Sequence, residues 1–325
     1  MGARRERVDE DSGTEGRVGA RWRGSSHHIR WRRSLLILRR QFEPTLWPVG
    51  LGNVLTNADH TLVMGILNVT PDSFSDGGRF LAFDAAVAHG LKMAEEGADL
   101  VDVGGESTRP GATPVDSEAE VERVVPVVRA LASAGVLVSV DTSKAAVAAQ
   151  AIEAGAVVVN DVTSLSDPEM AGVVARSGAG VVLMHMLGDP GTMQQDPQFG
   201  DVVTEVSNFL AERAQWAISQ GIDRERICLD PGIGFGKTVA HNLDLIASGV
   251  ASLAGSGFPV LVGASRKSFI ERVLGPIPVD ERDGASGAAH VLAIAAGASA
   301  IRVHNVVEGL RSARIADAIV RGETP

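Results

Sequence analysis

Residues 62 to 78 read Leu-Val-Met-Gly-Ile-Leu-Asn-Val-Thr-Pro-Asp-Ser-Phe-Ser-Asp-Gly-Gly, and this stretch contains the unit from which the chain is built. Its apolar first half is typical of a buried strand that ends at the polar residue Asn68. Its second half consists of turn-forming residues around one aromatic ring, Phe74. We interpret the second half as a loop that closes over a ligand, and an ordinary connection with one stray aromatic residue is the alternative.

The same unit recurs after residue 60, where each apolar run is followed by a polar residue, a loop and an alanine-rich amphipathic stretch. The predicted strands are residues 62–67, 99–103, 136–140, 156–159, 180–184, 227–229, 259–263 and 299–303. Eight alternations without a run of antiparallel hairpins predict a (β/α)8 TIM barrel over residues 58–325, in preference to an open doubly wound sheet.

Length, composition and charge fit one such domain. The 325 residues, 45% of them hydrophobic, can bury one large core. Residues 1–57 lack a sustained period, so we interpret them as a disordered N-terminal extension or as sequence upstream of the true start. Residues 1–40 hold 11 arginines and five acids, a net charge of about +6. Since the whole chain has a formal net charge of −10, the remainder carries about −16. The acidic body argues against nucleic acid as the main partner.

Several features predict a cytoplasmic location. The single cysteine, Cys228, has no partner for an internal disulfide, which fits a reducing compartment. The Arg-Arg-Ser-Leu-Leu-Ile-Leu run at residues 32–38 resembles a twin-arginine signal, but its apolar segment is too short for export. No stretch reaches the roughly 18 uninterrupted apolar residues of a membrane span, so we expect no membrane attachment.

The polar residues that follow the predicted strands are candidates for a functional site, because βα loops meet at the C-terminal face of a barrel. They are Asn68, the segment 106–109, Asp141, Asn160, His185, Asp230, the segment 265–268, Arg302 and His304. Each alone is more often a helix cap or a turn residue. Together, Asp141, Asn160 and Asp230 offer two acceptors and one mixed group, which suits a flat heterocycle with donor and acceptor edges.

A cationic group follows the last two strands. Ser265-Arg266-Lys267-Ser268 opens a predicted helix, and Arg302 and His304 project to the same side of the final strand. Barrels often bind phosphate there, so we predict a phosphate or diphosphate ester, with a solvated basic rim as the alternative. Asn68 can give one oxygen to magnesium when a diphosphate supplies others. His185 has no second histidine or cysteine at metal-binding spacing, so a zinc site is not predicted.

The strand-end motifs resemble those of the dihydropteroate synthases, pterin-binding barrels of folate synthesis. The resemblance covers about residues 60–322 and rests on Asn68-Val-Thr-Pro-Asp-Ser-Phe-Ser-Asp-Gly-Gly, Gly104-Gly-Glu-Ser-Thr-Arg-Pro-Gly, Asp141-Thr-Ser, Asn160-Asp, Leu183-Met-His-Met, Asp230-Pro-Gly-Ile-Gly-Phe-Gly-Lys, Ser265-Arg-Lys-Ser and Arg302-Val-His. It implies a magnesium-dependent, homodimeric transferase, of a kind that sulfonamides target. This enzyme would condense 6-hydroxymethyl-7,8-dihydropterin diphosphate with p-aminobenzoate and release diphosphate.

The resemblance also implies a role for each matching residue. The catalytic residues would be Lys267, Asp141 and Asp230. The pterin would be bound by Asp141, Asn160, Met184, Asp230, Phe235 and Lys267. The diphosphate would be bound by Asn68, Thr108, Arg302 and His304, with Asn68 also the magnesium ligand. The aminobenzoate would be bound by Phe74, Arg109, Pro110, Arg266 and Ser268.

Two departures from the family pattern accompany the resemblance. Asn305 follows His304 where the family often has aspartate, which we expect to alter a bond to His304. Thr163 and Ser164 stand where a glycine is common. Two alternatives stay open: a pterin-binding methyltransferase, which would not need the loop after Asn68 or the cationic group, and a divergent non-catalytic pterin-binding paralogue.

Overall fold

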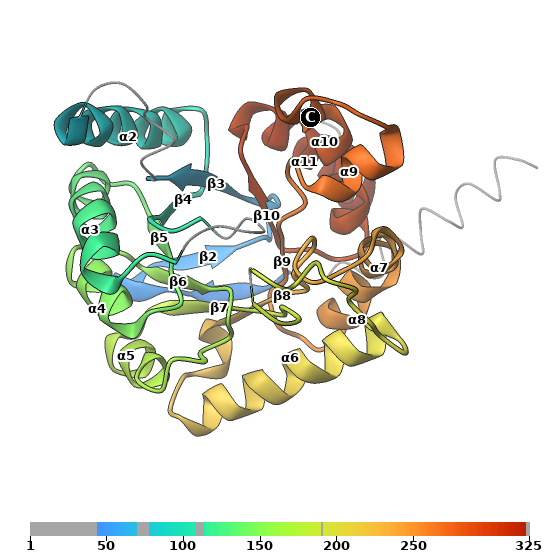
Figure 1. Ribbon diagram of the computed structural model, residues 1–325, viewed down its shortest axis with the longest axis horizontal. Coiled ribbons are helices and arrows are strands. Elements are labelled where there is room, and N and C mark those ends of the chain that lie inside the picture. Colours follow the sequence, from blue (N-terminus) through green and yellow to red (C-terminus); the bar gives the residue numbers. More distant parts are fainter. Residues whose placement is uncertain (1–43, 70–77, 108–113, 190, 323–325) are drawn as a thin grey trace, which may run out of the picture.

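The computed structural model describes residues 44–69, 78–107, 114–189 and 191–322 (Figure 1). Within these residues, parallel strands form one eight-stranded sheet in the order β8-β7-β6-β5-β4-β3-β10-β9. The strands are β3 (Leu62–Asn68), β4 (Leu100–Gly104), β5 (Val138–Asp141), β6 (Val158–Asp161), β7 (Gly180–Met184), β8 (Ile227–Asp230), β9 (Leu261–Val262) and β10 (Ala300–Val303). A bridge between Leu229 and Val260 brings the two edge strands together, so the sheet is nearly closed and the predicted (β/α)8 barrel is confirmed.

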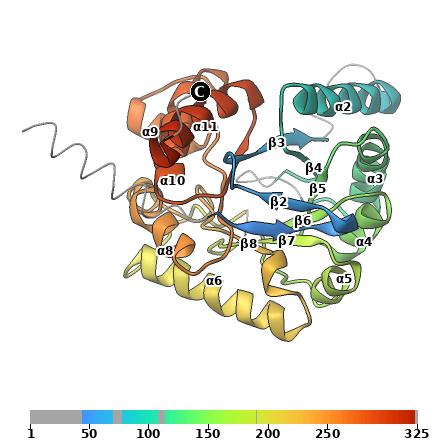
Figure 2. The ribbon, with the colours of Figure 1, turned by 180° about the vertical axis from the view of Figure 1, so that it is seen from behind.

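Helices alternate with the strands and surround them (Figures 1 and 2). They are α2 (Gly78–Glu95), α3 (Ser117–Ser133), α4 (Ala145–Glu153), α5 (Met170–Ser177), α6 (Val202–Ser219), α7 (Val239–Asp244), α8 (Val250–Ala254), α9 (Ser268–Leu274), α10 (Asp283–Ala295) and α11 (Val306–Arg321). Short 3-10 turns lie at Gly50–Gly52, Arg224–Arg226 and Val279–Arg282, and a π turn lies at Leu245–Gly249. Aspartate side chains cap the N-termini of α3 and α6. Asp116 accepts a hydrogen bond from Ala119 N, and Asp201 accepts hydrogen bonds from Val203 N and Thr204 N.

The hydrophobic core has an outer and an inner part. Valines such as Val101, Val103 and Val138 are fully buried in the outer part, where β-branched side chains suit a pleated surface covered by helices. Leu62, Met64, Leu100, Val158 and Cys228 fill the inner part. Burial raises the pKa of the Cys228 thiol well above its ordinary value, so this cysteine is a structural residue.

A short hairpin seals the barrel at the end opposite the polar strand ends. Strands β1 (Leu46–Pro48) and β2 (Val54–Thr56) pair antiparallel, and Figure 2 shows this hairpin, in blue, in front of the barrel. The Trp47 side chain is 1% exposed, and its Nε1 donates to the carbonyl of Arg226 over 2.8 Å. The prediction that residues 44–57 belong to a disordered extension is therefore wrong. The apolar side chains on this hairpin bury themselves against the inner core, whereas residues 1–43 lie outside the described residues.

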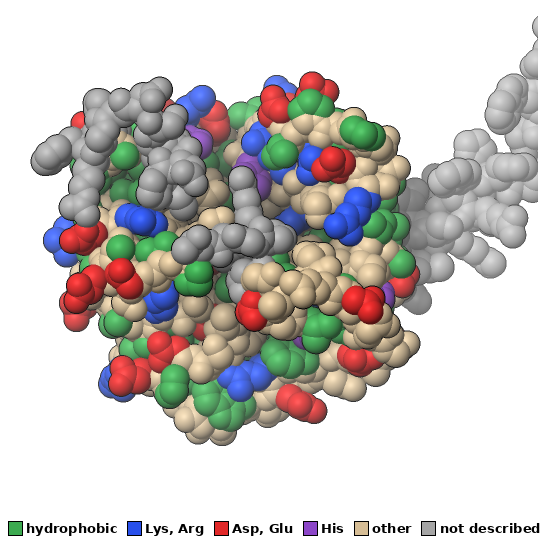
Figure 3. Space-filling view, in the orientation of Figure 1, with side chains coloured by type: hydrophobic (Ala, Val, Ile, Leu, Met, Phe, Trp, Pro, Cys, Tyr) green, Lys and Arg blue, Asp and Glu red, His purple; other side chains and the backbone are tan. Residues whose placement is uncertain are grey.

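No helix among the described residues is long and apolar enough to cross a membrane. On the face shown in Figure 3, acidic and basic side chains are interspersed over the surface.

Candidate active site

The strand ends bring the predicted polar residues to one end of the barrel. Asn68 pairs in register with Gly104, Gly104 with Asp141, and Asp141 with Asn160, so these residues lie at one level across four neighbouring strands. Asp230 ends β8 in register with Met184. The convergence expected for Asp141, Asn160 and Asp230 thus follows from the parallel register of the sheet.

A salt-bridge network links this level to Arg302 on β10. The Arg302 guanidinium donates from Nε to Asp102 Oδ2 over 2.6 Å and from Nη2 to Asp141 Oδ2 over 2.7 Å. Burial would lower the pKa of Arg302, but the carboxylates of Asp102 and Asp141 outweigh it and raise that pKa. The guanidinium is therefore a fixed cation beside Asp141.

Asp102 was not predicted as a site residue, yet it supports two residues that were. Its side chain is fully buried, and Oδ2 also accepts a bond from Asn160 Nδ2 over 2.9 Å. Since that bond uses the amide nitrogen of Asn160, the amide oxygen stays available as an acceptor. The sequence signal was a carboxylate in the middle of the apolar run Leu-Val-Asp-Val-Gly.

The two carboxyls expected to meet the heterocycle have perturbed acidities. Burial raises the pKa of Asp141 to about 7, although the charge of Arg302 acts in the opposite direction. Burial also raises the pKa of Asp230, although the hydrogen bond that Gly232 N donates to Asp230 Oδ1 over 2.7 Å lowers it. Donor groups of a ligand are the natural compensation for these desolvated carboxyls.

An apolar wall and a cation lie beside these carboxyls. Met184 and Phe235 are buried in one cluster with Val162 and Met193. The Lys267 ammonium lies 3.9 Å from the centroid of the Phe235 ring, and burial followed by repulsion from Arg302 lowers its pKa to about 8. A flat ring that packs on this wall would meet a cationic donor at its edge.

A second lysine, Lys237, donates to the backbone of Phe235 in the apolar wall. Lys237 was not predicted as a site residue from the sequence. Its Nζ bonds to His185 Nδ1 over 3.0 Å and donates to the carbonyls of His185 and Phe235. Burial and the charge of Lys237 lower the pKa of His185 to about 3, so the imidazole is neutral and its Nδ1 accepts. Gly232 has a φ of +69°, and a Cβ there would lie 1.9 Å from the His185 carbonyl oxygen, so only glycine fits.

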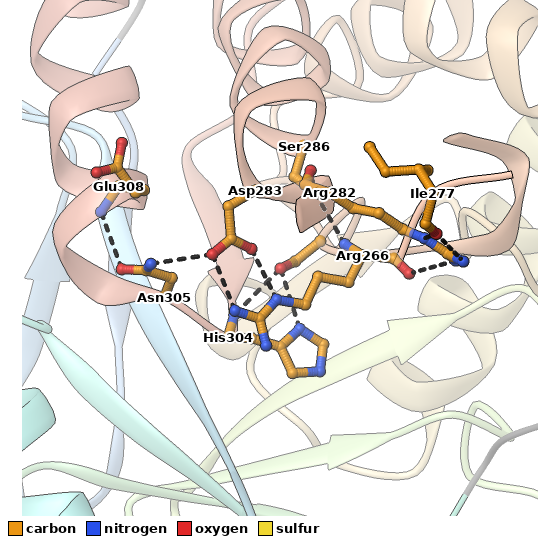
Figure 4. Close-up of polar contacts among 9 residues, drawn as sticks. Arg266, Ile277, Arg282, Asp283, Ser286, His304, Asn305 and Glu308 are labelled. Carbon is orange, nitrogen blue, oxygen red and sulfur yellow. Dashed lines mark hydrogen bonds and ion pairs between the residues drawn. The ribbon is translucent and has the colours of Figure 1, made fainter. Parts of the chain in front are cut away.

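The segment 265–268 follows β9 and ends at Ser268, the first residue of α9, beside the end of β10 (Figure 4). His304 bonds to the Ser265 hydroxyl through its backbone N over 3.1 Å and through its Nδ1 over 3.0 Å. The Arg266 guanidinium makes two bonds to Asp283, and the Asn305 side chain bonds to Asp283 and to the backbone of Glu308. The departure at Asn305 thus acts on Asp283 and on the start of α11.

Another ion-pair group lies at the base of the segment after β4. Lys144 bonds to Glu106 and to the fully buried Glu120, and Glu106 Oε1 accepts from Val115 N over 3.1 Å. The remaining predicted ligands Phe74, Thr108, Arg109 and Pro110 lie outside the described residues. Their roles therefore stay predictions.

Within the described residues, no group of three or more His, Cys, Asp or Glu side chains has the arrangement of a metal site. Asn68 is half-buried at the end of β3, one strand away from Gly104 and two from Asp141. Its position suits a hard cation that takes one side-chain oxygen from the protein and most ligands from a bound diphosphate and water.

Comparison with known proteins agrees with this geometry. A family model described as pterin binding enzyme matches residues 64–304. The dihydropteroate synthase of Escherichia coli K12 is 46% identical over 260 residues, which are 80% of this chain and 92% of that protein. A Xanthomonas albilineans dihydropteroate synthase solved with 4-aminobenzoic acid has 46% identity, a TM-score of 0.78 and coverage of 86% of this chain and 100% of that chain. A Yersinia pestis dihydropteroate synthase in a sulfonamide complex has 44% identity, a TM-score of 0.78 and coverage of 83% and 97%.

Proposed function

The chain belongs to the pterin-binding enzymes and, within them, to the dihydropteroate synthases, and from this premise we propose its reaction and its ligand contacts. It is a transferase that condenses 6-hydroxymethyl-7,8-dihydropterin diphosphate with p-aminobenzoate to form 7,8-dihydropteroate and diphosphate. The observation that carries this proposal is the convergence of Asp141, Asn160 and Asp230 at one end of the barrel, with Lys267 over the Phe235 ring.

The pterin lies on the wall formed by Met184 and Phe235. Asp230 and Asp141 accept hydrogen bonds from its amino and ring N–H groups, because a guanidine-like edge can give parallel bonds to a carboxylate. Asn160 presents its amide oxygen, since its nitrogen donates to Asp102. Lys267 donates to the acceptor atoms of the heterocycle.

The reaction needs no protein nucleophile. The bond between the pterin methylene carbon and the diphosphate oxygen breaks, and its electron pair leaves with diphosphate. The pterin ring spreads the resulting positive charge, which the carboxylates of Asp141 and Asp230 stabilise electrostatically. The lone pair of the neutral arylamine then forms the new C–N bond, and the amine nitrogen loses a proton.

Cations at the strand ends take up the charge of the leaving group. Arg302 and His304 lie on the final strand and just after it, and the pKa of Arg302 is raised, so Arg302 carries its charge throughout. We propose Asn68 as the protein ligand of a magnesium ion that, when bound, neutralises developing charge on the diphosphate. Thr108 is the fourth proposed diphosphate residue.

The aminobenzoate binds nearer the rim of the barrel. Ser268 is exposed and lies at the start of α9, and Arg266 is half-buried two residues before it. These two residues meet the carboxylate of aminobenzoate, while Phe74, Arg109 and Pro110 close around its ring. Binding between two loops, rather than in a deep pocket, fits a second substrate that enters after the pterin.

We also propose a cytoplasmic homodimer that acts on small molecules, without nucleic acid or membrane as partner. The apolar side chains that α10 and α11 expose support the dimer: they are Leu292 at 61%, Ile315 at 62% and Ile319 at 43%. Since α10 and α11 pack against each other, these side chains can contribute to one association surface.

The test is release of diphosphate together with formation of dihydropteroate, measured with both substrates and with each substrate alone. Product should appear only when the pterin diphosphate, aminobenzoate and magnesium are all present. Pterin binding by calorimetry without any product would identify a non-catalytic pterin-binding protein. The absence of both pterin binding and product would refute the proposal.

A further inference from the structure

Arg266 lies in a backbone conformation that must be held in place. Its φ is +57°, in the left-handed region, which is unfavourable for any residue with a Cβ. The start of α10 supplies the restraint: Arg266 N donates to Ser286 Oγ over 2.9 Å, and Arg282 Nη1 reaches the Arg266 carbonyl at 3.5 Å. Strained residues persist only where the surroundings fix them, and they cluster at ligand-binding positions.

The Arg266 side chain is fixed as firmly as its backbone (Figure 4). Nε donates to Asp283 Oδ1 over 2.7 Å and Nη2 donates to Asp283 Oδ2 over 2.9 Å. The two side chains are 25% and 17% exposed, so the pair is shielded from much of the solvent. A bidentate, charge-assisted pair sets both the position and the plane of a guanidinium. Asp283 therefore determines where the remaining N–H groups of Arg266 point.

Asn305 completes this arrangement from the other side. Its Oδ1 accepts from Glu308 N over 3.2 Å, which makes Asn305 the N-cap of α11. Its Nδ2 donates to Asp283 Oδ2 over 2.9 Å, so that oxygen receives bonds from both Asn305 and Arg266. Because each end of the amide has its own partner, its orientation is determined. A carboxylate at position 305 could still cap the helix, but it would face Asp283 with an oxygen instead of a donor.

We propose that Asp283 and Asn305 form a positioning pair that sets the place of the Arg266 guanidinium and thereby the affinity for the carboxylate of aminobenzoate. The inference deepens the proposed function and rests on it. The pair ties the segment 265–268 to the end of β10 at a second point, beside the bond between Ser265 and His304. In this proposal Asp283 and Asn305 act through Arg266 and do not themselves bind a substrate.

The first test compares the Michaelis constants for the two substrates. Asp283→Asn keeps the size of the side chain and removes the charged acceptor of Arg266. We expect KM for aminobenzoate to rise about tenfold, equivalent to about 1.4 kcal/mol, while KM for the pterin diphosphate stays within about twofold. Asp280→Asn is the matched control: Asp280 is an exposed acid in the preceding turn that acts on Arg266 through its charge. This control should change neither constant by more than about twofold.

The second test is a double-mutant cycle. Asn305→Asp should raise KM for aminobenzoate several-fold, because two carboxylates then face each other. In the double variant Asp283→Asn with Asn305→Asp one carboxylate again faces one donor, so Asn305→Asp should cost no further affinity in the Asp283→Asn background. KM for aminobenzoate should stay about tenfold above the parent, because Arg266 still lacks its charged acceptor. A general loss of folded protein would lower the apparent turnover number and leave both Michaelis constants unchanged.

Two outcomes overturn the inference in different ways. If the parent protein forms product and Asp283→Asn leaves KM for aminobenzoate within twofold, the inference fails and the proposed function stands. If the parent binds no pterin diphosphate and forms no product, the proposed function fails and the inference fails with it.

Discussion

Replacement of Trp47 by alanine should destabilise the barrel without touching the active site. The Trp47 side chain is 1% exposed and packs with Val49 and Leu55 beneath the inner core. Truncation of a buried aromatic residue costs about 3–5 kcal/mol, and loss of the bond to the Arg226 carbonyl adds about 1 kcal/mol. At roughly 2 °C per kcal/mol for a domain of this size, the melting temperature should fall by about 8–12 °C.

Differential scanning calorimetry of matched variants gives the measurement. Leu46→Ala is the control, because Leu46 lies on the same strand and is 63% exposed, and it should shift the melting temperature by less than about 1 °C. A chain beginning at Pro44 should melt with the parent, whereas one beginning at Asp59 should melt at least as low as Trp47→Ala. Turnover of Trp47→Ala well below its melting temperature should match the parent. A fall of less than about 2 °C for Trp47→Ala would refute the stabilising role of the hairpin.

Four further outcomes follow from the site. Lys267→Ala should lower turnover at least about a hundredfold, the scale of one preorganised donor, whereas the exposed Lys92→Ala should not change it. Calorimetry should show affinity for the pterin diphosphate rising roughly tenfold from pH 6 to 8. With a pKa of about 7, Asp141 is mostly protonated at pH 6 and mostly ionised at pH 8. Ligand donors favour the ionised form, so binding at pH 6 releases a proton, and Asp141→Asn should flatten this rise. Asp102→Ala should raise KM for the pterin diphosphate more than about tenfold, because Asn160 and one Arg302 donor lose their hydrogen-bond acceptor. Ser139→Ala is the control and should not change this KM, because it removes a buried hydroxyl without a partner among the described residues. A chelator should abolish turnover and leave the melting temperature unchanged; a fall in that temperature would contradict the single-ligand site at Asn68.

The strands could be predicted to within two residues, because in a parallel sheet covered on both faces each strand is a nearly continuous apolar run. Asn68, Asp141 and Asp230 end such runs, so the run lengths also indicated the polar residues that lie at the C-terminal ends of the strands. The hairpin at residues 46–56 could not be predicted in the same way. Its strands have three residues each, too few to show a period, and its burial depends on the open end of a barrel that forms far away in the sequence.

The missed residues have a common cause. Asp102 and Lys237 are fully buried polar groups whose partners come from distant strands and loops. In the sequence, Asp102 interrupts an apolar run and Lys237 ends a glycine-rich turn, but neither signal identifies a partner. Sequence motifs predicted the ligand-binding residues, whereas the three-dimensional contacts identify the side chains that orient these predicted residues. The same holds for Asp283, whose importance depends on Arg266 and Asn305 together.

The charges at the strand ends also fit the proposed binding of a pterin and a diphosphate at one site. Arg302 is bonded at Nε to Asp102 and at Nη2 to Asp141. A substrate that carries both a pterin and a diphosphate can replace the bond between Arg302 Nη2 and Asp141. Its N–H groups donate to Asp141, and its phosphate oxygens accept from Arg302. The bond to Asp102 need not break, because it uses Nε, and the two terminal nitrogens remain donors for phosphate oxygens in the same plane. Exchange of one ion pair for two ligand contacts therefore avoids leaving a buried charge unpaired, which would cost several kcal/mol.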